Sequence, residues 1–309
     1  MNDGGLSLVT CSYAPDFERC ERLCRSVERH CDASIPHLLL VPQRDTRLFA
    51  KLAGGRVRVV PVQSLLPKWL WQLPGFRKWW VTPFTPPVRG WILQQIVKLS
   101  VSAVAETEAV TFVDSDVVMI RRFDADALRR DGRWRLLRQE GHAADGRHLN
   151  WHRASAELLG LPPRDYFGSD YIGVFATWTM DNLRKLHDHL EARHGRPWPL
   201  TLCRRLDLSE YILYGVFVEH VLGDAPGHFH DDRPLSHNSW GFDLDTPAGR
   251  DAYVERVGPQ AVAALVQSNL GLDAHATAAL LDRVAQRVAN EQATSAGPRA
   301  GALATDSAS

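Results

Sequence analysis

The chain has 309 residues, with 36 Lys and Arg balanced by 36 Asp and Glu, so its formal net charge is zero. Such a chain has no overall positive field for nucleic acid or an anionic membrane, and we expect no nucleic-acid partner. It starts M-N-D-G-G without an apolar leader pattern, and no uncharged apolar run reaches the roughly 18 residues of a spanning helix. We therefore expect a soluble, cytoplasmic protein.

The first half of the chain alternates short apolar runs with amphipathic stretches. These patterns predict strands at residues 6–10, 37–41, 56–62 and 110–113, and helices at 15–30 and 89–106. The alternation favours an α/β fold with a mostly parallel, doubly wound sheet flanked by helices. Ligands of such sheets bind beyond the carboxyl ends of the strands. Two polar segments lie at such ends: T-C-S-Y-A-P-D after the first strand and D-S-D after the fourth.

The helix expected at residues 15–30 carries two of the five cysteines, and a third follows it directly. With His30 beside them, these cysteines could form a zinc site. They also recur at three- and four-residue steps with apolar neighbours, as in the buried stripe of a helix. The stripe consists of Phe17, Cys20, Cys24, Val27 and Cys31. Because free Cys behaves as a small hydrophobic residue, we predict a core role rather than zinc binding.

The second half of the chain is less regular. Its patterns predict a strand at 170–178, helices at 180–194 and 209–221, a polar His-rich segment at 227–240 and two or three helices at 251–289. Residues 290–309 are small and polar, which is typical of a disordered tail. We expect a single domain at residues 1–289, with 251–289 as its helical C-terminal extension.

The stretch T-F-V-D-S-D-V-V-M-I, residues 111–120, places two carboxylates in a mostly apolar run. Residues two apart in a strand point to the same side, so Asp114 and Asp116 can converge where the strand ends. Burying them in the ionised state is costly unless something compensates their charge. A hard divalent cation would do so, because it takes carboxylate oxygens and completes its shell with water and substrate phosphates. The alternative is a turn with two solvated carboxylates.

In these and later motifs the chain resembles glycosyltransferases of the GT-A fold, and in particular a group of uncharacterised bacterial glycosyltransferase-like proteins. The resemblance covers about residues 6–270. The motifs that carry it, in order, are L-V-T-C-S-Y-A-P-D, R-G-W-I-L-Q-Q-I-V-K-L, V-D-S-D-V, D-Y-I-G-V-F-A-T-W, S-E-Y-I-L-Y-G and L-S-H-N-S-W. It implies a nucleoside-diphosphate sugar as donor, with a UDP-sugar favoured, and a divalent metal, Mn²⁺ or Mg²⁺, that bridges the diphosphate to the D-x-D motif.

The resemblance implies donor-binding roles for residues of three segments. Asp116 is the expected direct metal ligand, whereas Asp114 contacts the donor ribose or sugar, or the metal through water. The expected donor-binding set is Thr10, Ser12, Tyr13, Asp16, Gln94, Gln95, Lys98, Asp114 and Ser115. Two alternatives stay open: the loop after the first strand is an ordinary turn in which Asp16 starts the next helix, and Lys98 is simply solvated.

His237, in L-S-H-N-S-W, matches the late histidine that completes the metal shell in several GT-A families. The expected metal ligands are therefore Asp114, Asp116 and His237. Neutral imidazole suits Mn²⁺ better than Mg²⁺, so this set predicts a manganese preference. A rival cluster is close by in the sequence and consists of His228, His230, Asp231 and Asp232.

Sugar transfer requires a group that accepts the proton of the acceptor hydroxyl, or a nucleophile if the configuration of the sugar is retained. The two candidates are Glu210, in S-E-Y-I-L-Y-G, and Asp170, in G-S-D-Y-I-G. Ser209 and Glu210 could equally serve as a capping pair at the start of a helix. The sequence leaves inversion and retention open.

Residues 68–91 hold five of the ten Trp, four Pro and four cationic side chains. One interpretation is a lid or acceptor wall for a small molecule, a glycan or a lipid-linked acceptor. The other is docking at the inner face of the membrane, since Trp mixed with Lys and Arg suits a bilayer interface. The aromatic residues expected at that surface are Trp69, Trp71, Trp79 and Trp80.

The sequence thus predicts a metal-dependent glycosyltransferase that moves a sugar from a nucleotide donor to an acceptor. Three other functions compete with it. A nucleotidyltransferase would share the sheet and the metal, but it usually has a Gly-rich basic loop that T-C-S-Y-A-P-D lacks. A metal-dependent hydrolase could use the cluster around His228, His230, Asp231 and His237. A non-catalytic protein could bind the donor without turnover.

Overall fold

The structure is a computed structural model that describes residues 3–72, 79–141, 146–267 and 271–295. Its central sheet has the strand order β3–β2–β1–β7–β13. The strands are β1 (Asp3–Cys11), β2 (His37–Val41), β3 (Val57–Pro61), β7 (Thr107–Phe112) and β13 (Ala176–Thr179). The first four are parallel and β13 is antiparallel to β7. The predicted mostly parallel sheet is therefore confirmed.

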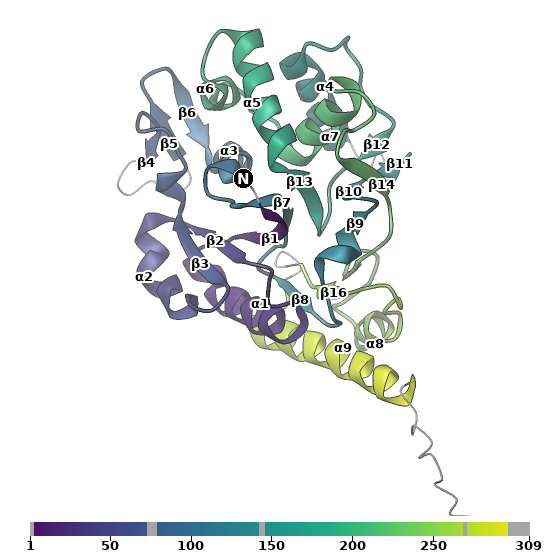
Figure 1. Cartoon of the computed structure of the whole chain (residues 1–309). Helices are drawn as coiled ribbons and strands as arrows, with labels where there is room; N and C mark the ends of the chain where they lie inside the picture. Colours follow the sequence, from purple (N-terminus) through teal and green to yellow (C-terminus); the bar gives the residue numbers. More distant parts are fainter. Residues whose placement is uncertain (1–2, 73–78, 142–145, 268–270, 296–309) are drawn as a thin grey trace, which may run out of the picture.

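Helices cover both faces of this sheet (Figure 1). One face packs on α3 (Gly90–Leu99), α5 (Met180–His194) and α7 (Glu210–His220), and the other on α1 (Phe17–His30) and α2 (Thr46–Phe49). Side chains alternate between the two cores along each strand. In β2, for example, Leu38 and Leu40 join the first core, whereas Leu39 and Val41 join the second. This two-sided burial explains why the strand sequence H-L-L-L-V is almost wholly apolar.

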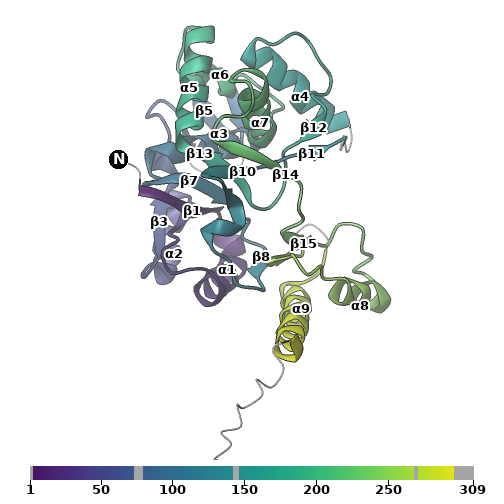
Figure 2. The same ribbon diagram turned by 45° about the vertical axis from the view of Figure 1, so that its right-hand side comes forward.

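Four smaller sheets surround the central one. They comprise β4 (Trp71–Gln72), β5 (Trp79–Thr82) and β6 (Thr85–Arg89); β8 (Val117–Met119), β15 (Ser236–Asn238) and β16 (Ala263–Leu265); β9 (Arg129–Arg130), β10 (Arg133–Leu137) and β14 (His228–Asp231); and β11 (Gln139–Glu140) with β12 (Ser169–Asp170). The remaining helices are α4 (Gly146–Leu159), α6 (Trp198–Cys203), α8 (Pro247–Glu255) and α9 (Ala274–Ser295). Figure 2 shows α8 and α9 at the foot of the molecule, beside β8 and β15.

Several predicted elements are present with changed boundaries. The helix expected at 89–106 ends at Leu99, and residues 100–103 continue as a 3-10 turn. The strand expected at 170–178 is divided into β12 and β13 by residues 171–175, the last of which, Phe175, has a left-handed φ of 63°. The extension at 251–289 includes the strand β16, and its last helix runs on to Ser295, six residues into the expected tail. Residues 296–309 of that tail lie outside the described residues.

The cysteine stripe on α1 is in the core, as predicted. Cys20, Cys24 and Cys31 are 0, 9 and 7% exposed, and all three are free thiols. Within the described ranges, no group of three or more His, Cys, Asp or Glu side chains is placed to hold a metal ion. These cysteines therefore contribute packing.

The order of the strands creates a switch point at β1. From β1 the chain adds β2 and β3 on one side, and it then returns to place β7 on the other side of β1. The connection after β1 therefore leads to one side of the sheet and the connection after β7 to the other. A crevice is left between them at the carboxyl ends of these two strands. Ligands of doubly wound sheets bind at such crevices. The loops there are T-C-S-Y-A-P-D and D-S-D, the two segments that the sequence indicated.

Candidate functional site: two adjoining cavities

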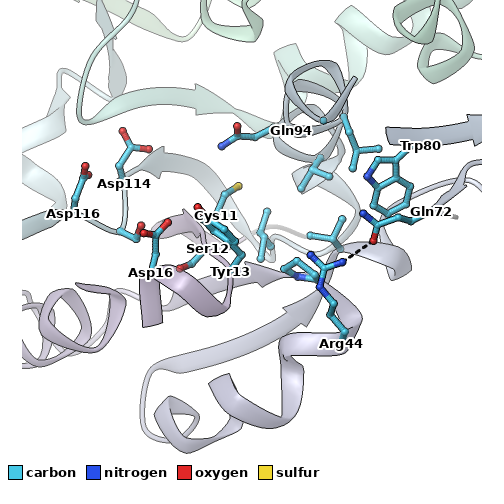
Figure 3. Close-up of a pocket in the computed structure, with 17 residues that line it drawn as sticks. Cys11, Ser12, Tyr13, Asp16, Arg44, Gln72, Trp80, Gln94, Asp114 and Asp116 are labelled. Carbon is cyan, nitrogen blue, oxygen red and sulfur yellow. Dashed lines mark hydrogen bonds between the residues drawn. The ribbon is translucent and has the colours of Figure 1, made fainter. Parts of the chain in front are cut away.

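A cavity of about 450 Å³ opens at this switch point. Three carboxylates, those of Asp16, Asp114 and Asp116, line one end of it (Figure 3). The last residue of β1, Cys11, and the loop residues Ser12 and Tyr13 line it as well, and α3 contributes Gln94. The volume lies in the range of small-molecule sites. We call it the first cavity.

The D-S-D motif lies in a turn between β7 and β8, which is after the strand, as the sequence predicted. The turn is closed by the backbone N–H of Val117, which donates to the carbonyl oxygen of Asp114 at 3.2 Å. Asp114 is exposed and Asp116 is half-buried, whereas Ser115 between them is buried. The burial cost that the apolar run suggested therefore does not arise, because the chain leaves the core just before the carboxylates.

The opposite end of the first cavity is aromatic and basic (Figure 3). There the Arg44 guanidinium donates to the side-chain oxygen of Gln72 at 2.8 Å, and Trp80 presents an indole that is 5% exposed. None of these three residues was in the predicted donor set. Arg44 follows β2, and the other two come from the small sheet β4–β5–β6. Only the packing of that sheet against the cavity brings them together.

The residues predicted in the loop after β1 take different positions. Ser12, Tyr13 and Asp16 line the first cavity, and Asp16 also precedes α1 and pairs with Arg19 at 2.8 Å. Thr10 lines neither cavity. It is fully buried, and its hydroxyl donates to the carbonyl oxygen of Val113 at 2.7 Å, which ties the end of β1 to the end of β7.

The Cys11 thiol in the cavity wall is not a nucleophile at neutral pH. Burial raises its pKa to about 12, and the negative charges of Asp114 and Glu210 add to this effect against the opposing charge of Lys98. A thiol with such a pKa stays protonated, so it offers the cavity a weakly polar surface.

A second cavity of about 540 Å³ adjoins the first, and Gln94 and Asp114 line both. Its walls come from α3, α4, α7, the β11–β12 pair and the segment after β15. Three tryptophans line it: Trp91, Trp151 and Trp240. The predicted residues Gln95, Lys98, Asp170 and Glu210 lie here rather than in the first cavity.

A buried ion pair lies in the wall of the second cavity. Lys98 Nζ is 2.9 Å from Glu210 Oε1, and the two side chains are 8 and 3% exposed. Lys98 also donates to the Tyr211 hydroxyl at 2.9 Å. Burial alone would lower the pKa of Lys98, but Glu210, Tyr211 and Asp114 outweigh it and hold this pKa well above the ordinary value. Lys98 is thus a firmly held cation, and the solvated alternative is wrong.

The local structure fixes Glu210 in place. Ser209 is the N-cap of α7 and accepts from the backbone N–H of Ile212 at 3.5 Å, so the predicted capping role belongs to the serine. The side-chain oxygen of Gln95 accepts from the backbone N–H of Glu210 at 3.2 Å. The ammonium group of Lys98 on its carboxylate completes this positioning.

Asp170 forms a different pair on the same cavity. It is 1% exposed, and its Oδ1 accepts from the backbone N–H groups of Tyr171 and Ile172 at 2.6 and 3.0 Å. Its Oδ2 lies 2.6 Å from Nδ1 of His148. Both oxygens of Asp170 are therefore occupied, and both Asp170 and His148 line the cavity. Sequence reasoning missed His148, since it lies in no motif and only α4 brings it here.

His237 is not brought to the aspartates. Its Nε2 lies 2.7 Å from the carbonyl oxygen of Tyr253, and its ring stacks on the ring of Tyr253. Within the described ranges, the expected three-ligand set of Asp114, Asp116 and His237 is thus not assembled. The motif L-S-H-N-S-W instead contributes its last residue, Trp240, to the second cavity.

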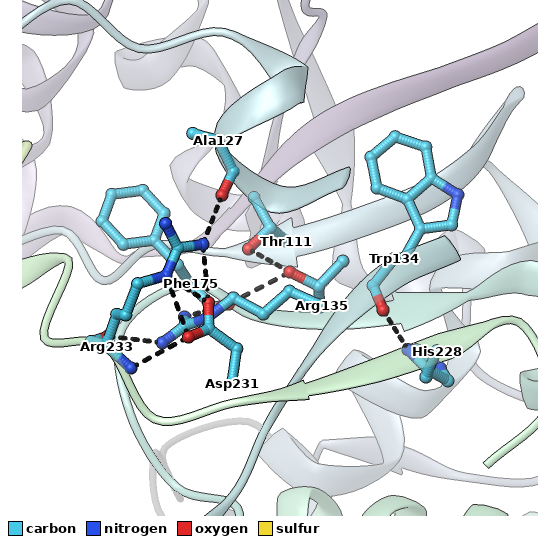
Figure 4. A network of polar contacts seen from close by, with 9 residues as sticks. Thr111, Ala127, Trp134, Arg135, Phe175, His228, Asp231 and Arg233 are labelled. Carbon is cyan, nitrogen blue, oxygen red and sulfur yellow. Dashed lines mark hydrogen bonds and ion pairs between the residues drawn. The ribbon is translucent and has the colours of Figure 1, made fainter. Parts of the chain in front are cut away.

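Three members of the rival cluster, His228, His230 and Asp231, form structural contacts, and the fourth, Asp232, is exposed; Figure 4 shows His228 and Asp231. Asp231 pairs with the buried Arg135 at 3.1 Å and with Arg233 at 2.7 Å. His228 lies between the Tyr214 hydroxyl, at 2.8 Å, and the carbonyl oxygen of Trp134, at 3.2 Å. His230 pairs with Glu219 at 2.8 Å. These residues hold β10 and β14 together, and within the described ranges no three of them meet at a metal-binding point.

The aromatic segment at 68–91 forms the sheet β4–β5–β6 as far as it is described, and residues 73–78 of it lie outside the described residues. Trp71 and Trp79 are 45 and 42% exposed. Trp80 faces the first cavity, and Trp69 packs on Phe84 at 5.8 Å. No helix in the part of the chain that the structure describes is both long enough and apolar enough to span a membrane.

Comparisons with known proteins place the chain in a family. Residues 5–234 match the model of a family described as "Family of unknown function (DUF6492)". A crystal structure of an active-site mutant of LgtC is similar with a TM-score of 0.46 and 14% sequence identity, over 93% of this chain and 95% of that one. No curated protein matches the sequence. Since the family model spans most of the chain, the protein belongs to the DUF6492 family.

Proposed function

We propose that this protein is a GT-A-type glycosyltransferase that moves a sugar from a nucleoside-diphosphate donor to the hydroxyl group of an acceptor. The observation that carries the proposal is the pair of cavities that meet at Asp114 and Gln94, at the switch point of the sheet. A transferase of this kind binds two substrates that must touch at one point. One cavity for each substrate, with a shared wall, meets that requirement.

The first cavity suits the donor. Its far end, with Trp80 for stacking and Arg44 and Gln72 for hydrogen bonds, would take the base. Tyr13 lies between the two ends of the cavity (Figure 3), and Tyr13 with the neighbouring Asp16 would contact the ribose. The diphosphate would then reach the aspartates of the D-S-D turn, where the two cavities join.

Two carboxylates would repel a diphosphate unless a cation lies between them. Asp114 and Asp116 offer the oxygen ligands that hard divalent cations prefer, and such cations keep waters and bind substrate phosphates. The residues present therefore fit Mg²⁺ or Mn²⁺, held by Asp116 and by Asp114 directly or through water. When bound, the metal would neutralise the charge that develops on the departing diphosphate. With His237 elsewhere, the reason to favour Mn²⁺ over Mg²⁺ is gone.

The second cavity suits the acceptor. In the transfer, the acceptor oxygen bonds to the anomeric carbon of the donor sugar and the bond from that carbon to the diphosphate breaks. The electron pair of that bond leaves with the nucleoside diphosphate, and the hydroxyl proton goes to His148. Asp170 would orient His148 through the contact with its Nδ1. Glu210 is the weaker candidate because Lys98 already neutralises it.

The first test is a thermal-shift panel of the protein with UDP, GDP, dTDP and CDP, each with Mg²⁺, with Mn²⁺ and without metal. A nucleotide at about 100 times its Kd adds roughly 2.7 kcal/mol to the free energy of unfolding, a rise of several degrees in Tm. We expect one nucleotide to give a metal-dependent rise that Asp116→Ala abolishes. Asp126→Ala, an exposed carboxylate outside both cavities, should leave it unchanged.

Turnover separates a transferase from a binding protein. The nucleotide sugar that matches the positive nucleotide should release nucleoside diphosphate, and Asp116→Ala should reduce this by about 10³-fold or more, since a metal contributes several kcal/mol. A flat response across the panel at millimolar nucleotide, or binding without any release, would contradict the proposal.

A further inference from the structure

We infer that the second cavity binds a neutral saccharide, and that the acceptor is therefore a glycan or free sugar rather than a lipid phosphate. The inference names the substrate class of the acceptor and in that sense rests on the proposed function. The binding of a saccharide can nevertheless be measured without any transfer reaction.

The aromatic lining is the first observation. Trp91 and Trp240 line the cavity with indoles that are 47 and 53% exposed, and Trp151 is stacked on Trp91 with ring centroids 5.9 Å apart. Exposed Trp faces in a concave site need a partner that covers them. A pyranose ring has a flat face of C–H groups and a rim of hydroxyls, so it can cover an indole and still form hydrogen bonds at its edge.

The polar groups of the cavity are the second observation. The indole Nε1–H of Trp151 has no hydrogen-bond partner among the described residues, although the side chain is only 7% exposed. A buried donor without a partner costs about 1–3 kcal/mol, which a ligand hydroxyl in the cavity would recover. The amide groups of Gln139 and Gln267 and the hydroxyl of Ser209 also line the cavity. Such groups can both donate and accept, as recognition of hydroxyls requires.

The charges of the cavity decide between neutral and anionic ligands. Lys98 is neutralised by Glu210 at 2.9 Å, and His148 lies against Asp170 at 2.6 Å. Asp114 adds a negative charge where the cavities join. Among the described residues, no other Lys or Arg lines the cavity. A phosphate or an acidic sugar would meet no uncompensated cation there, so a neutral ligand is favoured.

The test is a printed array of neutral saccharides, acidic saccharides and lipid phosphates, probed with the full-length protein alone and with the nucleotide and metal selected by thermal shift. The best neutral saccharide is then titrated by calorimetry. We expect Trp240→Ala to weaken its binding at least tenfold and Trp151→Phe, which keeps the ring but removes the N–H, to weaken it several-fold. Trp71→Ala, an equally exposed Trp outside both cavities, should bind normally.

The outcomes separate the two proposals. Trp240→Ala should keep the nucleotide thermal shift, since Trp240 lines only the second cavity. Nucleotide binding without any saccharide binding, exclusive binding of anionic ligands, or equal weakening in Trp71→Ala would overturn this inference and leave the donor site standing. If the protein bound a saccharide through Trp240 but bound none of the nucleotides, the proposal of a transferase would be overturned and the inference of a saccharide site would stand.

Discussion

The two cavities share a wall but hold their charges in opposite ways. In the first, Asp114 and Asp116 lie on a turn outside the core, at the end opposite to Arg44 (Figure 3). In the second, each buried acid is held by a basic side chain, Glu210 by Lys98 and Asp170 by His148. A mobile cation and a phosphate can reach charges on an accessible turn, whereas charges buried in the wall are part of the fold. We therefore expect the acids of the turn to matter for ligand binding and the buried acids of the second cavity to matter for stability.

The largest expected effect on stability is at Lys98. Lys98→Met would leave the Glu210 carboxylate buried without its cation, which costs about 3–5 kcal/mol of unfolding free energy. Urea unfolding at pH 7 would measure the loss.

Two control variants test the comparison directly. The double variant Lys98→Met with Glu210→Gln removes both charges and should recover much of the stability. Asp114→Asn, at the exposed turn, should change the unfolding free energy by less than about 0.5 kcal/mol while it removes metal-dependent nucleotide binding. Equal losses in Lys98→Met and Asp114→Asn would show that the two cavities do not differ in this way.

The first cavity was largely accessible to sequence reasoning. Strongly periodic or wholly apolar stretches define β2, α1 and α5, and the strand–helix alternation fixes where parallel strands end. Because ligands of such sheets bind at that edge, two short polar segments sufficed to find the cavity. Its aromatic and basic end was missed, since Arg44 belongs to no motif and Trp80, expected in a lid, an acceptor wall or a membrane surface, reaches this cavity only through tertiary packing.

The second cavity was not accessible in the same way. It is assembled from α3, α4, α7 and two short segments, and His148 and Trp151 come from a helix that no motif indicated. In L-S-H-N-S-W, the register of the three-residue strand β15 decides that His237 turns to Tyr253, and Trp240, beyond the end of the strand, reaches the cavity. A one-residue shift in such a strand would exchange the faces, and sequence alone does not define it.

The next effect concerns the proton acceptor. His148→Ala should reduce the turnover number for the saccharide acceptor by about 10²-fold or more, the usual contribution of a general base. The nucleotide thermal shift should persist, because His148 lines only the second cavity. Asp170→Asn should act in the same direction through the orientation of His148. A reduction in Glu210→Gln as large as in His148→Ala would return the role to Glu210.

The smallest expected effect is a dependence of the unfolding free energy on pH, which comes from a histidine in α4, a helix that lines the second cavity. His152 follows Trp151 in α4, is fully buried, and has no hydrogen-bond partner for either ring nitrogen among the described residues. Burial, with the nearby His148 and His220, lowers its pKa to about 4. The unfolded chain, with an ordinary pKa near 6.5, binds the proton more readily, so this contribution is present above about pH 6.5 and is lost as the pH falls towards 4.

The loss from His152 should amount to about 2 kcal/mol of unfolding free energy at pH 5, at about 1.4 kcal/mol per pH unit below 6.5. His152→Phe replaces the ring by one that does not titrate, so its unfolding free energy should fall less between pH 7 and pH 5 than that of the wild type, by this amount. His275→Phe, at an exposed position on α9, should behave as the wild type does. If His152→Phe and His275→Phe showed the same pH dependence, acid would act elsewhere in the fold, and α4 would not be the acid-sensitive wall of the second cavity.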